Sequence, residues 1–330
     1  MGIDQIKIRR MDDERILSPV AKEGRMIKKV RWLFLIILLL IPANLFGQES
    51  NLARTNDKAR FSASASSAHQ FKSNLDGGGD VSITHYGVGL GGSIPLTERL
   101  GLRTHLSYDR EEYNFSDRNV FLMTDPWSQI DRIGLSMRLH YTLTSQWNID
   151  AGPVVQYAGE TGAQFDDSLM YGGIITAVYR ANQSFSIGFG AGVFSRFQET
   201  KIFPSLIVSW KITDRLRLGN GFPLGLIGPA GLELSYKFTE NGEVALGGGY
   251  RSSRFRLDQN GPTHGGIGEN RSWPVYARIT RKLGSVIHID LYGGADFRGE
   301  MRLQDTHGND IRSIDYNTAP ILGFNLRANL

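Results

Sequence analysis

Apolar and polar residues alternate with a period of two along most of the chain after residue 60. The clearest run has apolar side chains at every second position from Ile133 to Leu143, with glycine, serine, arginine, histidine and threonine between them. Successive side chains of a strand point to opposite faces, so this run predicts a β-strand with one apolar face. Similar runs recur near 147–157, 185–193, 206–212, 230–238, 273–279, 287–291 and 322–330.

The connections between these runs alternate in length. Six are short, near 96–100, 143–147, 181–184, 212–216, 238–242 and 281–284. Seven are longer, near 70–80, 113–130, 160–168, 197–203, 219–228, 258–271 and 300–315. Thirteen connections join fourteen strands, and an even number places both chain ends on the short-turn side. Short turns at one end and long loops at the other are typical of transmembrane β-barrels.

These patterns predict an all-β fold, a closed antiparallel transmembrane β-barrel of about 14 strands with short periplasmic turns and longer extracellular loops. Twelve or sixteen strands are the alternatives. The runs are about as long as the ~9–11 tilted residues that cross an outer membrane. An exported soluble β-sandwich would also show alternation. The barrel is favoured by the long runs and by the aromatic residues at their ends, and its closure leaves no unpaired strand edge in lipid.

The apolar face of each strand is expected to meet lipid, and the polar face is expected to line the lumen. The same parity predicts these lumen-lining side chains: Arg103, Arg138, His140, Arg196, Lys211, Arg251, Arg278 and Asp290. A hydrated, salt-bridged interior is one interpretation, and an arginine ladder that favours anions is another. An interfacial aromatic belt is predicted at Trp147, Tyr157, Trp210, Tyr236 and Trp273, because these rings are apolar while their polar groups need water.

Residues 26–47 have the three parts of a secretory signal peptide. A basic segment precedes an apolar run from Trp32 to Ile41, and Gly47 lies at the expected cleavage position. The apolar run is too short for a transmembrane helix, which needs ~20 residues. Removal of the signal predicts a single barrel domain over residues 48–330. Residues 1–25 fit no part of a signal and are interpreted as a misplaced start or an N-terminal extension.

The charge and the cysteine count narrow the classes of function. The chain carries 37 Lys and Arg and 33 Asp and Glu, but residues 1–47 hold nine of the basic and five of the acidic ones, so the remainder is balanced at 28 of each. A balanced chain gives no support for nucleic-acid binding. The absence of cysteine excludes disulfides, thiolate metal sites, a cysteine nucleophile and a lipid anchor on cysteine.

Short motifs with candidate chemistry are weak. His105 and Ser107 have the His-x-Ser spacing of outer-membrane phospholipases, but both have lumen parity, away from lipid. His288 and Asp290 form a His–Asp pair without a third ligand. The glycine-rich pieces at 87–92 and 188–192 are not followed by the helix of a nucleotide-binding loop, and the carboxylate-rich loops lack EF-hand spacing. No catalytic, cofactor-binding or metal site is predicted.

Given these strands and a signal ending in Phe46-Gly47-Gln48, the chain resembles Gram-negative outer-membrane β-barrel proteins of an uncharacterised family. Many such barrels end in an aromatic residue, whereas this chain ends in Leu330, with Phe324 on the same face. The resemblance implies an outer-membrane location, with outer-membrane lipid and the assembly machinery as partners. A passive pore for small solutes is the favoured function. The alternatives are a non-enzymatic surface or structural barrel acting through its loops and, third, a lipid-modifying enzyme.

Overall fold

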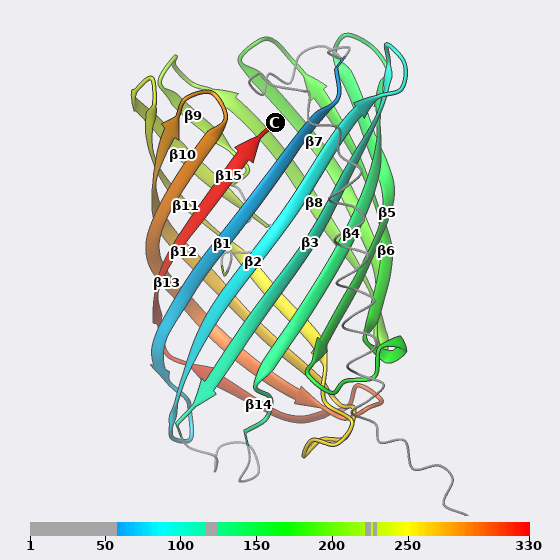
Figure 1. The fold of residues 1–330 in the computed structure, drawn as a ribbon, viewed down its shortest axis with the longest axis vertical. Helices are drawn as coiled ribbons and strands as arrows, with labels where there is room; N and C mark the ends of the chain where they lie inside the picture. The colour runs from blue at the N-terminus through cyan, green and yellow to red at the C-terminus, as the bar shows by residue number, and fades with distance from the viewer. Residues whose placement is uncertain (1–57, 117–124, 222–225, 227–229) are drawn as a thin grey trace, which may run out of the picture. The chain divides into compact units, whose positions relative to one another are not determined.

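The computed structural model describes residues 58–116, 125–221, 226 and 230–330. The predicted signal peptide, residues 1–25 and the start of the mature chain lie outside these ranges. The described residues form one antiparallel sheet that closes on itself, as the tilted strands in Figure 1 show. Figure 1 also shows the C-terminus at the upper end, with the short turns, and the β1–β2 connection at the lower, long-loop end.

The described elements are fifteen strands and a short 3₁₀ helix, η1 (Asp166–Ser168). The first eight strands are β1 (Arg60–Asn74), β2 (Asp80–Pro95), β3 (Leu100–Phe115), β4 (Gln129–Thr142), β5 (Trp147–Glu160), β6 (Leu169–Arg180), β7 (Phe185–Arg196) and β8 (Glu199–Lys211). The others are β9 (Leu216–Gly219), β10 (Ala230–Thr239), β11 (Gly242–Arg256), β12 (Ile267–Leu283), β13 (Ile287–Gln304), β14 (Asp310–Tyr316) and β15 (Ala319–Asn329).

Fifteen strands make a barrel of fourteen because β14 and β15 share one place in the ring. β14 pairs with the long-loop end of β13, and β15 pairs with the remainder of the same strand. Only Asn317 and Thr318 separate the two. β15 also pairs with β1, and β12 pairs with β13, so the ring is closed. The predicted closed antiparallel barrel of 14 strands is confirmed.

The six short turns lie where the sequence predicts them. Three share a threonine whose hydroxyl accepts a hydrogen bond from the backbone N–H three residues later, at 3.0 Å for Thr97, 3.0 Å for Thr144 and 2.9 Å for Thr213. A side-chain hydroxyl that bonds nearby backbone stabilises a tight reversal. The recurring threonine therefore explains why these connections are short.

The long-loop end differs from the prediction in detail. The predicted loop at 197–203 is wrong, because only Phe197 and Gln198 separate β7 from β8. Residues 300–315 form the β13–β14 hairpin rather than an open loop, and β12 already begins at Ile267. Polar residues at these positions looked like loop residues in the sequence. In the structure many of them are paired in strands that continue beyond the apolar band.

The outer surface of the barrel carries large apolar side chains. Exposed examples on different strands are Leu139, Ile175, Phe189, Leu246 and Leu322. In water such a surface would favour aggregation, whereas in lipid it is the expected wall of a transmembrane barrel. Within the described ranges, no helix has the length and apolar character needed to cross a membrane.

Candidate functional site: the barrel interior

The half of the barrel next to the short turns is called the short-turn half, and the half next to the long loops is called the long-loop half. Small residues along β1 and β2 line the inner wall of the short-turn half. Ser62, Ser64 and Ser66 on β1 lie opposite Gly91, Gly89 and Gly87 on β2. A Cβ atom on Gly89 would lie 2.8 Å from the hydroxyl of Ser64 and 3.1 Å from Cε1 of His105. The absent side chains therefore leave room for the histidine ring against this wall.

A basic cluster surrounds one carboxylate on the wall formed by β3, β4 and β5. Nη1 of Arg103 and Nδ1 of His140 each lie 3.1 Å from Oδ1 of Asp150. Arg138 is the direct cross-strand partner of Arg103. Its charge also acts on Asp150. This group, Arg103, Arg138, His140, Asp150 and the neighbouring His105, is called the Asp150 cluster below.

A second pair of cations lies elsewhere on the same half. Lys211 on β8 is the direct partner of Arg217 on β9. Lys211 contacts Asp214 of the turn at 2.6 Å, and Arg217 donates a hydrogen bond to Ser209 at 3.4 Å. The side chains of both cations are solvent-exposed. Water therefore reaches this part of the inner wall.

A dense ionic network covers the wall from β10 to β15. Arg278 contacts Glu233, Glu243 at 3.0 Å and Asp290 at 3.1 Å. Asp290 is fully buried and also accepts a hydrogen bond from Arg327 at 3.1 Å. Because each charge has an opposite partner, this network stabilises neighbouring strands and leaves little free charge for a solute.

A different ionic contact crosses the barrel at its long-loop half. Glu111 on β3 contacts Arg132 of β4 at 2.8 Å and Arg251 of β11 at 2.7 Å. Ser253 of β11 accepts a hydrogen bond from Arg132. β11 lies seven strands from β4 in the ring in either direction. These side chains can meet only across the interior, so the barrel is bridged here.

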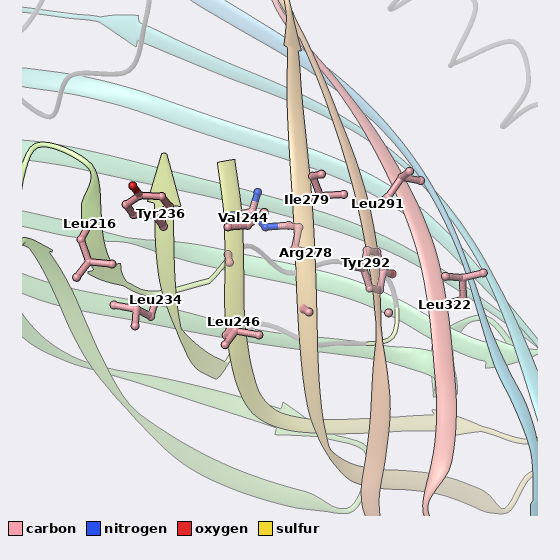
Figure 2. Close-up of a pocket in the computed structure, with 13 residues that line it drawn as sticks. Leu216, Leu234, Tyr236, Val244, Leu246, Arg278, Ile279, Leu291, Tyr292 and Leu322 are labelled. Carbon is pink, nitrogen blue, oxygen red and sulfur yellow. The ribbon is translucent and has the colours of Figure 1, made fainter. Parts of the chain in front are cut away.

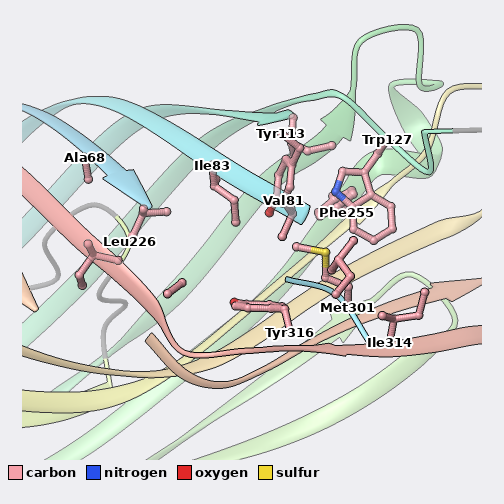
Figure 3. Packing of buried hydrophobic residues seen from close by; sticks show 14 of the residues in the cluster. Ala68, Val81, Ile83, Tyr113, Trp127, Leu226, Phe255, Met301, Ile314 and Tyr316 are labelled. Carbon is pink, nitrogen blue, oxygen red and sulfur yellow. The ribbon is translucent and has the colours of Figure 1, made fainter. Parts of the chain in front are cut away.

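A cluster of buried apolar side chains fills the same half (Figure 3). Trp127 is 1% exposed and packs edge-on against Phe255 and Tyr113, with ring centroids 5.3 Å and 5.9 Å apart. Met301 from β13 and Ile314 from β14 belong to the same cluster. Side chains from β3, β11, β13 and β14 therefore close the interior of the barrel.

Backbone and side-chain contacts join the long-loop ends of the strands that carry this cluster to neighbouring parts of the barrel. Arg256, at the end of β11, pairs with Gly159 of β5, which is the one parallel bridge among the described strands. The guanidinium of Arg256 lies 5.0 Å from the ring centroid of Phe197 in the β7–β8 turn. The amide of Gln198 donates to the carbonyl of Thr306 at 2.8 Å. The lid is defined as residues 251–272 and 297–316. It consists of the long-loop ends of β11, β12 and β13 together with β14.

The tip of the β13–β14 hairpin is organised by one carboxylate. Asp305 accepts hydrogen bonds from the backbone of His307 at 2.8 Å and from the backbone and side chain of Asn309 at 2.9 Å each. The bonds from Asn309 hold the pKa of Asp305 below its usual range. The hairpin that touches Gln198 is therefore a defined turn.

The predicted lumen residues fall into separate groups. Arg103, Arg138 and His140 come together in the Asp150 cluster, whereas Lys211 lies apart from them. Arg278 and Asp290 join the wall network, and Arg251 bridges the barrel. Arg196 is buried, with its guanidinium 5.4 Å from the ring centroid of Phe203. Their function as lumen-lining residues stays a prediction.

The sequence interpretation missed Glu111 and the aromatic closure. Glu111 has the same strand parity as Arg103 on β3, so parity could have identified it. Trp127 and Phe255 gave no such signal, because Trp127 lies in a connection and Phe255 lies at the end of a strand. Burial of these side chains depends on how the strand ends bend inward, which the alternation does not encode.

The candidate chemical motifs gain no further ligands or catalytic partners. His105 and Ser107 lie opposite Gly91 and Gly89 on the inner-wall register, away from the apolar outer surface. His288 lies beside Arg327 in the register of β13 and β15. Across residues 58–116, 125–221, 226 and 230–330, no group of three or more histidine, aspartate or glutamate side chains is placed to hold a metal ion.

Four of the five predicted aromatic belt residues are exposed on the outer surface, whereas Tyr157 is half-buried and stacks on Phe165 with centroids 5.4 Å apart. Trp147, Trp210, Tyr236 and Trp273 are each exposed by about two fifths to one half. Trp147 packs against Tyr179, with centroids 5.0 Å apart. The contact of these rings with the membrane interface stays a prediction.

A groove of about 570 Å³ follows the outer wall over β9 to β13 and β15 (Figure 2). Its lining includes the exposed side chains of Leu234, Leu246, Ile279 and Leu322. Because these four residues have outward parity, they belong to the expected lipid-facing surface, although the lining also includes the buried residues Arg278 and Tyr292.

Comparisons with known proteins give one family and several proteins of similar fold. The chain is similar to a FadL homologue of Pseudomonas aeruginosa, with 15% identity, a TM-score of 0.48 and coverage of 83% of this chain and 90% of that one. It is also similar to the toluene transporter TodX of Pseudomonas putida, with 10% identity, a TM-score of 0.40 and coverage of 83% and 90%. The NanC porin has 11% identity, a TM-score of 0.34 and coverage of 79% and 98%.

These likenesses concern the barrel architecture alone. No curated protein matches the chain. Residues 127–327, more than half of the chain, match the family described as a domain of unknown function, DUF6268. Together with the closed 14-strand barrel, this match confirms the predicted resemblance to outer-membrane barrels of an uncharacterised family. The chain belongs to the DUF6268 family.

Proposed function

We propose that the chain is an outer-membrane channel for small solutes whose long-loop mouth is closed by the lid in this state. One observation carries the proposal. Inner-wall side chains of the short-turn half, including Arg103 and Lys211, are solvent-exposed although they lie on the lumen side of the register. A polar wall that water reaches is what a channel needs and what a fully packed barrel lacks.

The chemistry of the closure supports a lid that can open. Glu111, Arg132 and Arg251 meet across the barrel as a buried charged group. Replacing a buried ion pair by apolar residues is often neutral or stabilising, because charges lose hydration when they are buried. Charges at a closure regain that hydration when it opens. The ionic bridge is therefore a weaker closure than apolar packing of the same size.

Single-channel conductance in a planar lipid bilayer tests this function. The variant Glu111→Gln leaves two arginines facing each other without a carboxylate, so we expect it to open more often than the unaltered chain. A matched control is Asp131→Asn, which removes a carboxylate from an outward-facing pair with Arg110. The control is expected to leave opening unchanged.

A reversible disulfide across the lid distinguishes current that passes through an opened lid from current that takes another path. The chain has no cysteine, so a double variant carries only the introduced thiols. A Cβ on Gly308 would lie 3.2 Å from Cβ of Gln198, slightly below the spacing of ~3.5–4.5 Å in disulfides, and the φ of 86° at Gly308 requires the turn to adjust for a cysteine. The oxidised Gln198→Cys/Gly308→Cys chain should be silent and should conduct again after reduction. Current that persists in the cross-linked chain would contradict a lid at this position.

The surface or structural barrel is the second candidate, and the buried cluster around Trp127 favours it. That cluster packs as a protein core does, and a permanent core would leave no path for solutes. If both the unaltered chain and Glu111→Gln stay silent after circular dichroism has shown a β-rich fold, the channel proposal fails. The surface role would then be preferred. Insertion into outer-membrane lipid with the help of the assembly machinery is part of both proposals.

A further inference from the structure

The Asp150 cluster contains a charge arrangement that needs a partner. Arg103 and Arg138 are direct cross-strand neighbours on the inner wall, and like charges in direct register are destabilising. One carboxylate, Asp150, contacts Arg103 and His140, and the charge of Arg138 acts on it without a direct contact. In the wall network from β10 to β15, by comparison, Arg278 alone contacts three carboxylates.

The geometry around Arg138 points in the same direction. Among the described residues, Nε of Arg138 is buried and has no hydrogen-bond partner. A buried donor without a partner is unfavourable unless a ligand or water satisfies it. His105 lies on the adjacent wall, where its ring packs over Gly89 with Cε1 3.1 Å from the position that a Cβ would take. Donors of Arg103 on β3 and Arg138 on β4 are therefore neighbours of a histidine on the same inner wall.

We propose that the Asp150 cluster binds a small oxyanion, a carboxylate or phosphate solute, on its way through the short-turn half of the barrel. Guanidinium groups match the planar geometry of carboxylate and phosphate oxygens, and hydrogen bonds between ionised groups are stronger than neutral ones. The binding anion supplies the second negative charge that the arginine pair lacks. This proposal rests on the proposed channel for its biological role, although the binding itself does not require conductance.

The second like-charged pair extends the same preference along the wall. Lys211 and Arg217 are direct partners on β8 and β9, and their side chains are exposed. Asp214 contacts Lys211 from the turn. Two pairs of neighbouring cations on one half of the lumen raise the local concentration of anions. We expect these residues to attract the solute and the Asp150 cluster to hold it.

Binding is measured on the folded chain in detergent or vesicles, with inorganic phosphate and succinate as probes. A ligand that binds only the folded state raises the midpoint of urea unfolding. Both probes are compared with chloride at the same ionic strength. We expect phosphate or succinate to raise the midpoint more than chloride does, and we expect Arg138→Gln to weaken binding roughly 10- to 100-fold, as loss of a charged hydrogen bond does.

Arg110→Gln is the matched control. Arg110 is on β3 like Arg103, but it pairs with Asp131 on the outward-facing register at 2.8 Å. The Arg110→Gln variant should bind phosphate and succinate as the unaltered chain does. Equal effects of chloride and the oxyanions, or unchanged binding in Arg138→Gln, would overturn the anion site.

Current measurements separate this proposal from the channel itself. If the chain binds phosphate but never conducts, the anion site is supported and the channel is contradicted. If the chain conducts without anion preference, and phosphate and succinate shift its unfolding midpoint no more than chloride does, the channel is supported and the site is contradicted. Anion-selective current that Arg138→Gln reduces and Arg110→Gln does not would support both.

Discussion

Two carboxylates define the difference between the halves of the barrel: Glu111 contacts two arginines, and Asp150 contacts one. Glu111 is 3% exposed and joins Arg132 to Arg251 across the interior. Asp150 contacts Arg103, whose side chain is 44% exposed. The same pairing of residue types is a buried bridge in the long-loop half and a hydrated site in the short-turn half.

The size of the inner-wall side chains produces this difference. In the short-turn half, small serines of β1 and glycines of β2 face the interior, and Arg103 of β3 is exposed, whereas Arg278 and Asp290 on the far wall are buried. In the long-loop half, aromatic and aliphatic side chains of β3, β11, β13 and β14 meet and exclude water. The alternation of inward and outward residues is the same in both halves. The volume of the inward side chains, and not the period of the alternation, decides how much of the interior is filled.

The largest expected effect is on the buried carboxylate. Glu111→Gln leaves Arg132 and Arg251 buried without the carboxylate that contacts them both, so we expect a loss of about 3–5 kcal/mol in the free energy of unfolding. Asp150→Asn is the matched change in the other half. Because its contact with Arg103 reaches water, we expect a smaller loss of about 1 kcal/mol. Urea titration of the barrel in lipid vesicles measures both.

Equal losses in the two variants would contradict the comparison. They would mean that Asp150 is as isolated from water as Glu111, and that the short-turn half is filled in the membrane. The conductance of the same two variants provides a second readout, since only Glu111→Gln is expected to change how often the lid opens.

The next effect concerns the two faces of one strand. Leu139→Arg places a charge on the outward, apolar face of β4, where we expect a loss of about 2–4 kcal/mol in lipid. Ser136→Arg places the same side chain on the inward face of that strand. There water can hydrate it, so the loss should be much smaller. The reverse ranking, measured by urea titration, would overturn the assignment of the faces.

Much of the fold could be predicted from the sequence because a barrel strand needs only a period and a turn. The alternation from Ile133 to Leu143 gave β4, and Thr97, Thr144 and Thr213 mark turns that the structure contains. Fourteen strands followed from counting connections. Both signals are local, so a single sequence carries them.

The lid could not be predicted because it depends on contacts between distant residues. Nothing near Phe255 indicates that it packs against Trp127, and nothing near Arg251 indicates a partner on β3. Residues 300–315 looked like a loop because they are polar, yet they form a hairpin over the barrel. Parity correctly identified inward positions such as Arg138, but it gave no information about which of them are in contact.

The last pair of variants should change the free energy of unfolding least. It tests whether a water-soluble reagent reaches each half of the interior. The variants Ser64→Cys and Ser253→Cys each add one thiol to a cysteine-free chain, on the inner wall of the short-turn and long-loop halves respectively. Ser253 is 7% exposed and belongs to the lid, whereas Ser64 lies opposite Gly89 and is partly exposed. A charged, membrane-impermeant thiol reagent should label Ser64→Cys readily, because water carries the reagent to it.

Labelling of Ser253→Cys reports on the lid itself. A closed lid limits the reaction to the fraction of time that the lid is open, so its rate measures that opening. Adding Glu111→Gln to Ser253→Cys should accelerate labelling, whereas adding Asp150→Asn should not. If Ser253→Cys reacts as fast as Ser64→Cys in the unaltered background, the long-loop half is open to water. The two halves would then differ in composition but not in access, and the closed state would not be the one that the membrane holds.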